Sequence, residues 1–554
     1  MQTIPVYCKN TNSLIYAPFG QKLYDFLQEH QLLPETPYLG ALVNNNVHDL
    51  GYQIHKPSII DFFDYYSSYG RPFYIRSLYL LLCKTVHDLL PVKVRLRIKH
   101  SISGGRFCTL ENMDEPITEE LVKKMFQHMK KIVQMNIPFE RVEMLTDDAI
   151  EVLGELGMED KYELLKTRNK IFTSVYRLDT TVNYYYGNLV PSTGYLQLFG
   201  LEKYENGILL KIPSAKNVKV LPKTHSNPKL FAQYQMSKDW AEKIGVVTVS
   251  DMNRIVKEGR ALETILVAEA FQEKWIANVA DQIHHRQGVK MVLISGPSSS
   301  GKTSTCRRLS MQLAVLGYKP VQISVDDFFV ERDETPLDAN GEKDFEALEA
   351  IDLPLFNDTL KRLVAGECVE IPTFDFAKGS KLWTGKTLQL EENSIMVVEG
   401  IHCLNPKLTE QLPDDLKFKI FVSALTSISI DRQNPIPTTI NRLIRRIVRD
   451  YNYRGYSALD TLKRWNSVRR GEEKNIFPYQ ENADVMINTS LIFELGLLKN
   501  YAIPILREVP ETVPQYAAAS SLLKFLSFFQ PIYESDIPPT SILREFVGGS
   551  KFKY

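Results

Sequence analysis

Short apolar runs alternate with amphipathic stretches along the second half of this 554-residue chain. Residues 291–295, 321–325 and 395–398 are mostly apolar runs with the length of a buried strand. Between them apolar residues recur at helical spacing, as at Leu309, Leu313 and Leu316. This alternation predicts a parallel α/β sheet covered by helices over residues 289–496.

The first half has a different pattern. Residues 1–66 hold strand-like runs around one amphipathic segment, which predicts a small α+β domain, and residues 67–222 predict a second, larger α+β domain. Residues 253–286 carry an apolar stripe at helical spacing, so we expect residues 223–288 to be a helical linker. Residues 497–554 predict a C-terminal helical extension. The chain is therefore expected to be multidomain.

Composition narrows the class of protein. The chain has 66 Lys+Arg and 66 Asp+Glu, so its formal net charge is zero. This balance argues against a broad nucleic-acid surface but leaves room for a local basic patch, so nucleic acid is an expected partner only through the first half. Six scattered cysteines without a C-x-x-C pair indicate free thiols in a reducing compartment. With no signal peptide or membrane-spanning run recognised, we expect a cytoplasmic protein without a membrane partner.

The sharpest local signal is the run from Gly296 to Thr303, GPSSSGKT, which fits the P-loop pattern G-x-x-x-x-G-K-[ST]. It follows a predicted strand and precedes a predicted helix, which is the context the motif requires. Backbone N–H groups and the helix N-terminus would surround the phosphates of ATP. Lys302 would reach the β- and γ-phosphates and the Thr303 hydroxyl would bind Mg²⁺. The expected ATP-binding residues are Gly296, Ser298, Ser299, Ser300, Gly301, Lys302, Thr303 and Ser304.

Carboxylates follow two further predicted strands. Asp326 and Asp327 come directly after residues 321–325, and Glu399 ends the run at 395–398. A carboxylate at this edge of a parallel sheet can accept the proton of an attacking hydroxyl or complete a Mg²⁺ site. The alternative is that the aspartates cap a helix. We expect Asp326 to act as base and to lie near Mg²⁺ with Thr303 and Glu399; which aspartate is the base stays open.

Arginines gather in residues 441–454. Arg442, Arg445 and Arg449 share one face of a predicted helix, and Arg446 and Arg454 lie beside them. A solvated basic face is the alternative interpretation. Clustered guanidiniums can neutralise a transferring phosphoryl group. We therefore expect Arg445, Arg449 and Arg454 to form a lid over the phosphates, with Arg445 contacting both ATP and the acceptor.

The order of these motifs resembles the uridine kinase and phosphoribulokinase family of P-loop kinases. The matching segments are residues 296–303, 324–329, 371–376, 399–400 and 442–450. The resemblance implies that Asp326 is the general base, that Phe374 stacks near a base and that Glu346 holds ribose hydroxyls, with Asp375 also near the substrate. Two departures stand out: Gly379 replaces a base-reading histidine, and Tyr456 replaces the second arginine of an Arg-Gly-Arg. We expect a void at Gly379 and a loss of pyrimidine selectivity.

The first half resembles the amino-terminal region of threonyl-tRNA synthetase, a β-grasp TGS domain (1–66) followed by an editing domain (67–222). The resemblance rests on residues 76–82, 89–91, 175–177 and 187–194. The positions of the editing domain's two metal-ligand pairs hold Arg76, Leu80, Tyr185 and Leu189, so no editing chemistry is expected. Arg76, Arg106 and the tyrosines at 184–186 are candidates for a remodelled pocket.

Together the two halves resemble a bacterial family of fused nucleoside kinase-like proteins. The sequence predicts an ATP- and Mg²⁺-dependent kinase acting on a hydroxyl of a nucleoside or related sugar alcohol. An RNA- or tRNA-associated regulatory protein that only binds ATP, and a kinase of RNA termini, are the alternatives. The acceptor's identity and the oligomeric state, for which a homodimer is one option, are not determined by the sequence.

Overall fold

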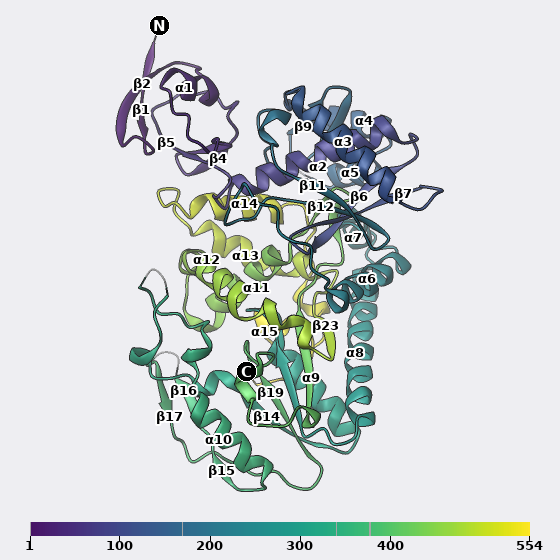
Figure 1. Ribbon diagram of the computed structural model, residues 1–554, viewed down its shortest axis with the longest axis vertical. Coiled ribbons are helices and arrows are strands. Elements are labelled where there is room, and N and C mark those ends of the chain that lie inside the picture. Colours follow the sequence, from purple (N-terminus) through teal and green to yellow (C-terminus); the bar gives the residue numbers. More distant parts are fainter. Residues whose placement is uncertain (1, 169, 339–340, 376–377, 554) are drawn as a thin grey trace.

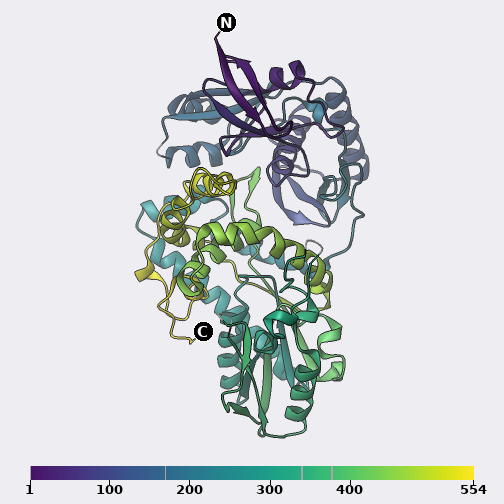
Figure 2. The ribbon, with the colours of Figure 1, turned by 90° about the vertical axis from the view of Figure 1, so that its left-hand side faces the viewer.

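The structure is a computed structural model that describes residues 2–168, 170–338, 341–375 and 378–553 (Figure 1). Phe376, in the predicted substrate segment 371–376, lies outside the described residues. Figures 1 and 2 show the first half at one end of the molecule, a parallel sheet at the other end and a layer of helices between them. No helix in the described ranges is long and apolar enough to span a bilayer.

A five-stranded sheet with strand order β2-β1-β5-β3-β4 occupies the N-terminal end. Strands β1 and β5 pair in parallel, and the other neighbours pair antiparallel. Leu23, Phe26 and Leu27 of α1 lie on one helix face and are buried in the same core as the sheet. The elements are β1 (Thr3–Cys8), β2 (Ser13–Pro18), α1 (Leu23–Glu29), β3 (Gly40–Val43), β4 (Asn46–His48) and β5 (Ser58–Phe63).

A second α+β unit follows, built on an antiparallel four-stranded sheet, β11-β12-β7-β6, and a three-stranded sheet, β10-β9-β8. Helix α2 is apolar almost all round and is therefore buried. The elements are α2 (Gly70–Leu89), β6 (Arg95–Ile102), β7 (Gly105–Glu111), α3 (Glu119–Gln134), β8 (Glu140–Leu145), α4 (Thr146–Glu155), α5 (Glu159–Lys166), β9 (Phe172–Leu178), β10 (Thr181–Tyr184), β11 (Gly200–Tyr204) and β12 (Gly207–Lys211).

The four positions compared with the metal ligands of an editing domain are closely packed. Leu80, Tyr185 and Leu189 are buried. The Arg76 guanidinium donates to the Asn188 carbonyl oxygen, and the Tyr185 hydroxyl lies 3.8 Å from Cys83 Sγ. These side chains are not zinc ligands, and they fill the space between α2 and the segment after β10. The TGS and editing-domain assignments stay predictions.

Three helices lead into the C-terminal half, where the predicted parallel α/β sheet is confirmed. All five strands are parallel, in the order β14-β19-β13-β20-β23, so β13 lies at the centre. The elements are α6 (Pro228–Lys243), α7 (Val249–Lys257), α8 (Ala261–His285), β13 (Met291–Ser295), α9 (Lys302–Val315), β14 (Lys319–Ser324), α10 (Leu353–Val364), β19 (Ser394–Glu399), β20 (Lys417–Ser423) and β23 (Val485–Asn488).

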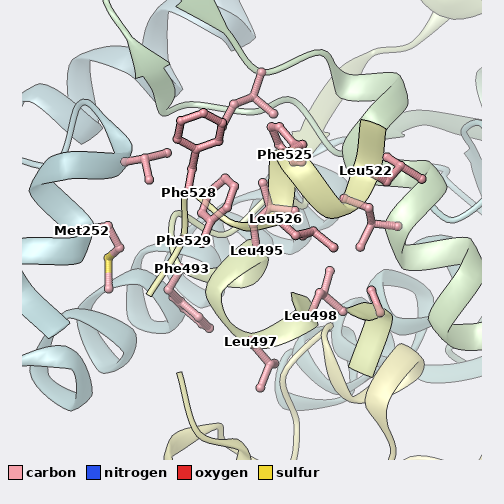
Figure 3. Packing of buried hydrophobic residues seen from close by; sticks show 14 of the residues in the cluster. Met252, Phe493, Leu495, Leu497, Leu498, Leu522, Phe525, Leu526, Phe528 and Phe529 are labelled. Carbon is pink, nitrogen blue, oxygen red and sulfur yellow. The ribbon is translucent and has the colours of Figure 1, made fainter. Parts of the chain in front are cut away.

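Helices α11, α13 and α14 form the middle layer, and one hydrophobic core joins them to α4, α5 and α7 (Figure 3). The residues after 497, predicted as a separate extension, are packed into this core through Leu522, Phe525 and Leu526. The predicted domain boundaries stay predictions. The elements are α11 (Thr438–Arg454), α12 (Ala458–Asn475), α13 (Glu494–Arg507), α14 (Tyr516–Leu526) and α15 (Arg544–Val547).

A hairpin of the C-terminal half is anchored in the first half. It is formed by β21 (Ser429–Asp431) and β22 (Asn434–Pro435) and leads directly into α11. Lys161 Nζ lies 2.6 Å from Asp431 Oδ1, and both side chains are fully buried. The Ile98 N–H donates to the Arg432 carbonyl oxygen at 2.8 Å. The first half therefore fixes the start of the helix that carries the arginine cluster.

Candidate active site

The P-loop connects the central strand β13 to α9. Ser299 and Gly301 have φ angles of 56° and 83°, in the left-handed region. Such alternation turns successive N–H groups toward one point and creates an anion-binding concavity. Gly296 allows the close approach of Val422, whose carbonyl oxygen would lie 2.1 Å from an added Cβ. The Ser299 and Ser300 hydroxyls are buried without a partner among the described residues. The loop thus fits a phosphate ligand.

Thr303 and Glu399 meet at the carboxyl end of the sheet. The Thr303 hydroxyl donates to Glu399 Oε1 at 3.0 Å, and Lys302 Nζ lies 3.4 Å from the Pro297 carbonyl oxygen. Burial raises the pKa of Glu399 to about 7, although the Lys302 ammonium opposes this shift. Among the described residues no group of three or more His, Cys, Asp or Glu side chains could hold a metal. An oxygen pair that leaves most positions to phosphate and water fits Mg²⁺.

The two neighbouring aspartates, Asp326 and Asp327, have different surroundings in the structure. Both lie on a short 3₁₀ turn, Val325–Phe328, that continues β14. Asp327 Oδ1 accepts a hydrogen bond from the Phe374 N–H at 3.2 Å, so it fixes strand β16 (Thr373–Asp375). Asp326 lies near enough to Glu399 and Glu346 for its charge to raise the pKa of both. Asp326 is thus the aspartate that lies near Glu399 and Glu346.

Glu346 lies against α12 and close to the P-loop. A Cβ on Gly471 would lie 2.3 Å from the Glu346 Cβ, so only glycine allows this approach. Burial raises the pKa of Glu346 to about 7, against the opposing charges of Arg446 and Lys302. The Asn475 side-chain amide donates to the Glu346 carbonyl oxygen at 2.7 Å. Glu346 is therefore held beside the phosphate-binding region.

The remaining predicted substrate residues lie on a small hairpin of β16 and β17 (Ser380–Leu382). The Phe374 ring packs 5.5 Å from the Phe329 ring. Asp375 Oδ1 accepts a hydrogen bond from the Lys378 N–H at 3.1 Å. Two further strands, β15 (Val369–Glu370) and β18 (Thr387–Leu388), pair beside this hairpin.

The void expected at Gly379 is filled. A Cβ added there would lie 2.4 Å from Arg332 Nε and 2.7 Å from Arg332 Cζ. The Arg332 N–H also donates to the Gly379 carbonyl oxygen at 2.9 Å. The expectation of an empty, imidazole-sized space was wrong, because an arginine from a distant segment occupies it.

Two arginines of α11 lie beneath the P-loop rather than over it. Arg442 forms a buried ion pair with Glu472 and donates to the Ser298 carbonyl oxygen at 3.0 Å. The Ser298 N–H donates to the same Glu472 carboxylate at 3.1 Å. Arg445 is fully buried, pairs with Glu494 and donates to the Thr489 carbonyl oxygen at 2.8 Å.

This placement corrects the expectation for Arg445. Its guanidinium is held by Glu494 and Thr489, and it approaches the P-loop only at the Ser299 carbonyl oxygen, 3.5 Å away. Residues 442, 445 and 449 do share one helical face, but Arg442 and Arg445 form buried ion pairs there. The structure therefore does not place Arg445 in a lid.

The arginines available to a phosphate surround Asp450. Arg446 Nε and Arg449 Nη2 lie 3.1 and 2.8 Å from its carboxylate, and Arg454 Nε lies 3.8 Å away. Arg446 Nη1 also donates to the Ser298 hydroxyl at 2.8 Å. Repulsion from Arg449 contributes most to lowering the pKa of Arg454 to about 10. The sequence analysis named Arg446 in the cluster but did not include it in the expected lid, although its i, i+4 spacing to Asp450 was a signal.

A carboxylate from the C-terminal end was also missed. Glu545 of α15 accepts hydrogen bonds from the Ser304 N–H at 3.3 Å and from the Ser304 hydroxyl at 2.5 Å. Ile542 lies against Gly301, where an added Cβ would be 2.9 Å from its Cγ2. No local pattern links residues 241 positions apart.

Known proteins match the same part of the chain. Residues 291–491 match the model of the Phosphoribulokinase / Uridine kinase family. A uridine kinase of Macrococcus caseolyticus is 28% identical over 195 residues, which span 35% of this chain and 85% of the relative. A uridine kinase of Staphylococcus aureus strain JH9 is 27% identical over 195 residues, or 35% of this chain and 84% of the relative.

Two solved structures are similar over 38% of this chain. One is a putative fructose transport system kinase from Silicibacter, 18% identical, with 98% of its chain covered and a TM-score of 0.28. The other is a possible uridine kinase from Bacillus stearothermophilus, 20% identical, with 97% of its chain covered and a TM-score of 0.27. The family match and the parallel sheet with its P-loop agree on one assignment: the C-terminal region of this chain, residues 291–491, is a P-loop kinase domain of the phosphoribulokinase/uridine kinase family.

Proposed function

We propose that this protein is an ATP- and Mg²⁺-dependent kinase that transfers the γ-phosphate to a hydroxyl of a nucleoside or a related sugar alcohol. The observation that carries the proposal is the convergence of Lys302, the Thr303–Glu399 contact and Asp326 at one edge of the sheet. These are the groups that a phosphoryl transfer to an alcohol requires: a phosphate anchor, oxygen ligands for a metal and a base.

The P-loop and its two oxygen ligands hold the donor. The backbone N–H groups around Ser299 and Gly301 bind phosphate oxygens, and Lys302 neutralises charge on the β- and γ-phosphates. Thr303 and Glu399 would hold Mg²⁺, which supplies charge neutralisation between those phosphates when it is bound. Arg442 and Arg445 stabilise the P-loop by donating hydrogen bonds to the carbonyl oxygens of Ser298 and Ser299.

Asp326 is the proposed base. Its carboxylate accepts the proton of the acceptor hydroxyl while the hydroxyl oxygen forms its bond to the γ-phosphorus. The bond from that phosphorus to the bridging oxygen breaks, and ADP leaves with the electron pair. Arg446, Arg449 and Arg454 stabilise the equatorial charge from the Ser298 side, and their closure over the phosphates excludes water.

Glu346 and Phe374 are proposed to hold the acceptor. Glu346 accepts hydrogen bonds from sugar hydroxyls beside the phosphate site, and Phe374 presents an aromatic ring on the hairpin that Asp327 anchors. The Arg332 side chain occupies the position compared with a base-reading histidine. Its donors differ in number and geometry from an imidazole, so we propose that uridine is not the preferred acceptor.

The experiment is a transfer assay with the full-length protein. Radiolabelled ATP and Mg²⁺ are incubated with nucleosides, sugars and polyols, each with and without tRNA. The proposal expects one class of small alcohol to accept phosphate without tRNA. Labelling of tRNA alone would favour a kinase of RNA termini. ATP binding with no transfer to any compound would favour a regulatory protein that only binds ATP.

A further inference from the structure

Four cationic side chains near the junction of α2, the chain after α5 and α14 have no carboxylate within 4 Å among the described residues, although the charge of Glu143 acts on Lys170 from beyond that distance. Arg76, Arg168, Lys170 and Lys524 make no ion pair with Asp or Glu in the part of the chain that the structure describes. By contrast, Lys161, which lies in the same half, is matched by Asp431. Unpaired like charges gathered in one place repel each other, so such a cluster calls for a specific explanation.

An aromatic cluster lies between two of these cations. The Tyr186 ring lies 5.9 Å from the Phe528 ring and 6.3 Å from the Phe525 ring; Phe525 lies in the last turn of α14 and Phe528 just after the helix (Figure 3). The Arg76 guanidinium lies 6.0 Å from the Tyr186 ring. The Arg168 guanidinium lies 4.1 Å from the Phe528 ring. Arg76 and Arg168 therefore flank one packed aromatic group.

Lys524 completes the cluster from α14. The Arg168 guanidinium reaches Ser527 Oγ at 3.5 Å, and the Ser527 hydroxyl donates to the Lys524 carbonyl oxygen at 2.7 Å. The Lys524 side chain is solvent-accessible. Nevertheless, desolvation by the surrounding protein, together with the charges of Lys170, Arg76, Arg168 and Arg141, lowers the pKa of Lys524 to about 7.

Arg141 belongs to the edge of this group. It is 3.3 Å from Asp49 Oδ2, so its charge is partly matched. It also lines a cavity of about 1480 Å³ between the N-terminal sheet and the second unit, as does Tyr176. Burial raises the pKa of Tyr176, and the charges of Arg141 and Arg76 both oppose this shift, so the tyrosine lies near both arginines. The cations thus extend to the margin of an open cavity.

We propose that Arg76, Arg168, Lys170 and Lys524, with Arg141 at the margin, form a second anion-binding site that takes a phosphate-bearing ligand. Guanidinium groups present paired donors that match two phosphate oxygens, and a ligand with several negative charges would relieve the mutual repulsion. The partly exposed Tyr186 ring offers an apolar surface beside the charges. No residue of this site belongs to the P-loop or to the arginines around Asp450.

The structure also shows which of the residues expected to line a remodelled pocket lie at the proposed site. Arg76 and Tyr186 border the proposed site. Arg106 instead donates to the Tyr79 hydroxyl at 3.0 Å, and Tyr185 is buried. Tyr184 is also buried, but its hydroxyl accepts from the Arg168 guanidinium at 2.8 Å and so helps to hold this arginine. A free phosphorylated metabolite and the backbone of an RNA share the required chemistry, and the experiment separates them.

The test measures acetylation of Lys524 in the full-length protein by mass spectrometry at pH 7.5. The added probes are inorganic pyrophosphate or a 12-nucleotide single-stranded RNA of the order of 10 µM, a length that allows several phosphate contacts. We expect at least one probe to slow Lys524 acetylation by about tenfold, while the exposed Lys131 of α3 is unaffected. Arg168→Ala should remove most of this protection. Protection by pyrophosphate indicates a small phosphorylated ligand, and protection by RNA alone indicates a nucleic acid.

The second measurement is the affinity of the protecting probe. Fluorescence anisotropy measures it for labelled RNA, and calorimetry measures it for pyrophosphate. Lys524→Glu should weaken binding of the protecting probe by about tenfold, whereas the matched charge reversal Lys131→Glu should not. Lys131→Glu should leave thermal unfolding unchanged, and Lys524→Glu should not lower it, because a carboxylate at position 524 relieves the repulsion among the neighbouring cations. Failure of both probes to protect Lys524, or equal binding by Lys524→Glu and wild type, would overturn the proposal.

Discussion

Glu545 and Ser304 are joined by two hydrogen bonds, because the Glu545 carboxylate accepts from both the N–H and the hydroxyl of Ser304. Ser304 lies in the first turn of α9, directly after the P-loop, where helix N–H groups bind phosphate. A carboxylate of the C-terminal end therefore occupies donors that a nucleotide would use. If a nucleotide binds at the P-loop as proposed, we expect the two anions to compete for this position and ATP to displace Glu545.

Removing the charge of Glu545 should tighten ATP binding. We expect Glu545→Gln to lower the KM for ATP by about tenfold, equivalent to ~1.4 kcal/mol, because the amide repels phosphate less and leaves the segment packed. Steady-state kinetics at several ATP concentrations measure this change. Asp536→Asn makes the same change of charge in the preceding segment and should leave KM unaltered. An unchanged or raised KM in Glu545→Gln would argue against competition.

The two neighbouring aspartates should differ in kinetics. Asp326→Asn removes the proposed base and should lower kcat by about 10²–10⁴-fold with little effect on ATP affinity. Asp327→Asn loses a charged acceptor for the Phe374 N–H and should mainly raise the KM of the acceptor. Turnover and ATP binding are measured for both variants. If the larger loss of kcat occurs in Asp327→Asn, the two roles are exchanged.

The Arg442–Glu472 pair should stabilise the P-loop. Both side chains are almost completely buried, and removing Arg442 would leave the buried Glu472 carboxylate to Arg469 and the Ser298 N–H, at a cost of up to ~3–5 kcal/mol. We expect Arg442→Met to lower the thermal unfolding midpoint and to weaken ATP binding. Arg469→Ala is the matched control, since Arg469 contacts the same carboxylate from a more exposed position.

A double variant separates stability from positioning in this pair. Arg442→Met combined with Glu472→Met replaces the ion pair by apolar side chains and should recover much of the lost stability. It cannot recover the contacts to the backbone of Ser298, so weak ATP binding should persist. Full recovery of ATP binding in the double variant would show that the pair only stabilises the fold.

The sequence predicted the parts of the site that depend on local order. The P-loop, Asp326 and Glu399 follow apolar strands, and parallel strands bring their carboxyl ends to one edge. The sequence could not show which arginines pack inside the protein and which face the phosphate-binding loop. Arg445 and Arg446 are adjacent, but the tertiary contacts of α11 place Arg445 against Glu494 and Arg446 against the Ser298 hydroxyl. The side chain of Arg332 at Gly379 and the contact of Glu545 with Ser304 depend on long-range folding that no local pattern encodes.

Glu346 should make stability depend on pH. Burial raises its pKa from 4.5 to about 7. Between these values the folded protein binds more protons than the unfolded chain, so this group lowers stability as pH rises through the window. Relative to wild type, Glu346→Gln should therefore gain thermal stability between pH 5 and pH 8. The exposed neighbour variant Glu349→Gln should follow wild type, and parallel curves for all three proteins would contradict the burial of this carboxyl group.

The most direct test of the central claim is ATP-dependent phosphate transfer to small alcohols by wild type and by Lys302→Ala, measured with purified full-length protein. Lys302 contacts no carboxylate within 4 Å in the described part of the chain, so the variant should keep the wild-type unfolding midpoint. The account predicts phosphate transfer to a nucleoside or polyol by wild type and a loss of at least ~10²–10³-fold in the variant. Equal transfer by the folded variant, or no transfer by wild type to any compound of the panel, would contradict it.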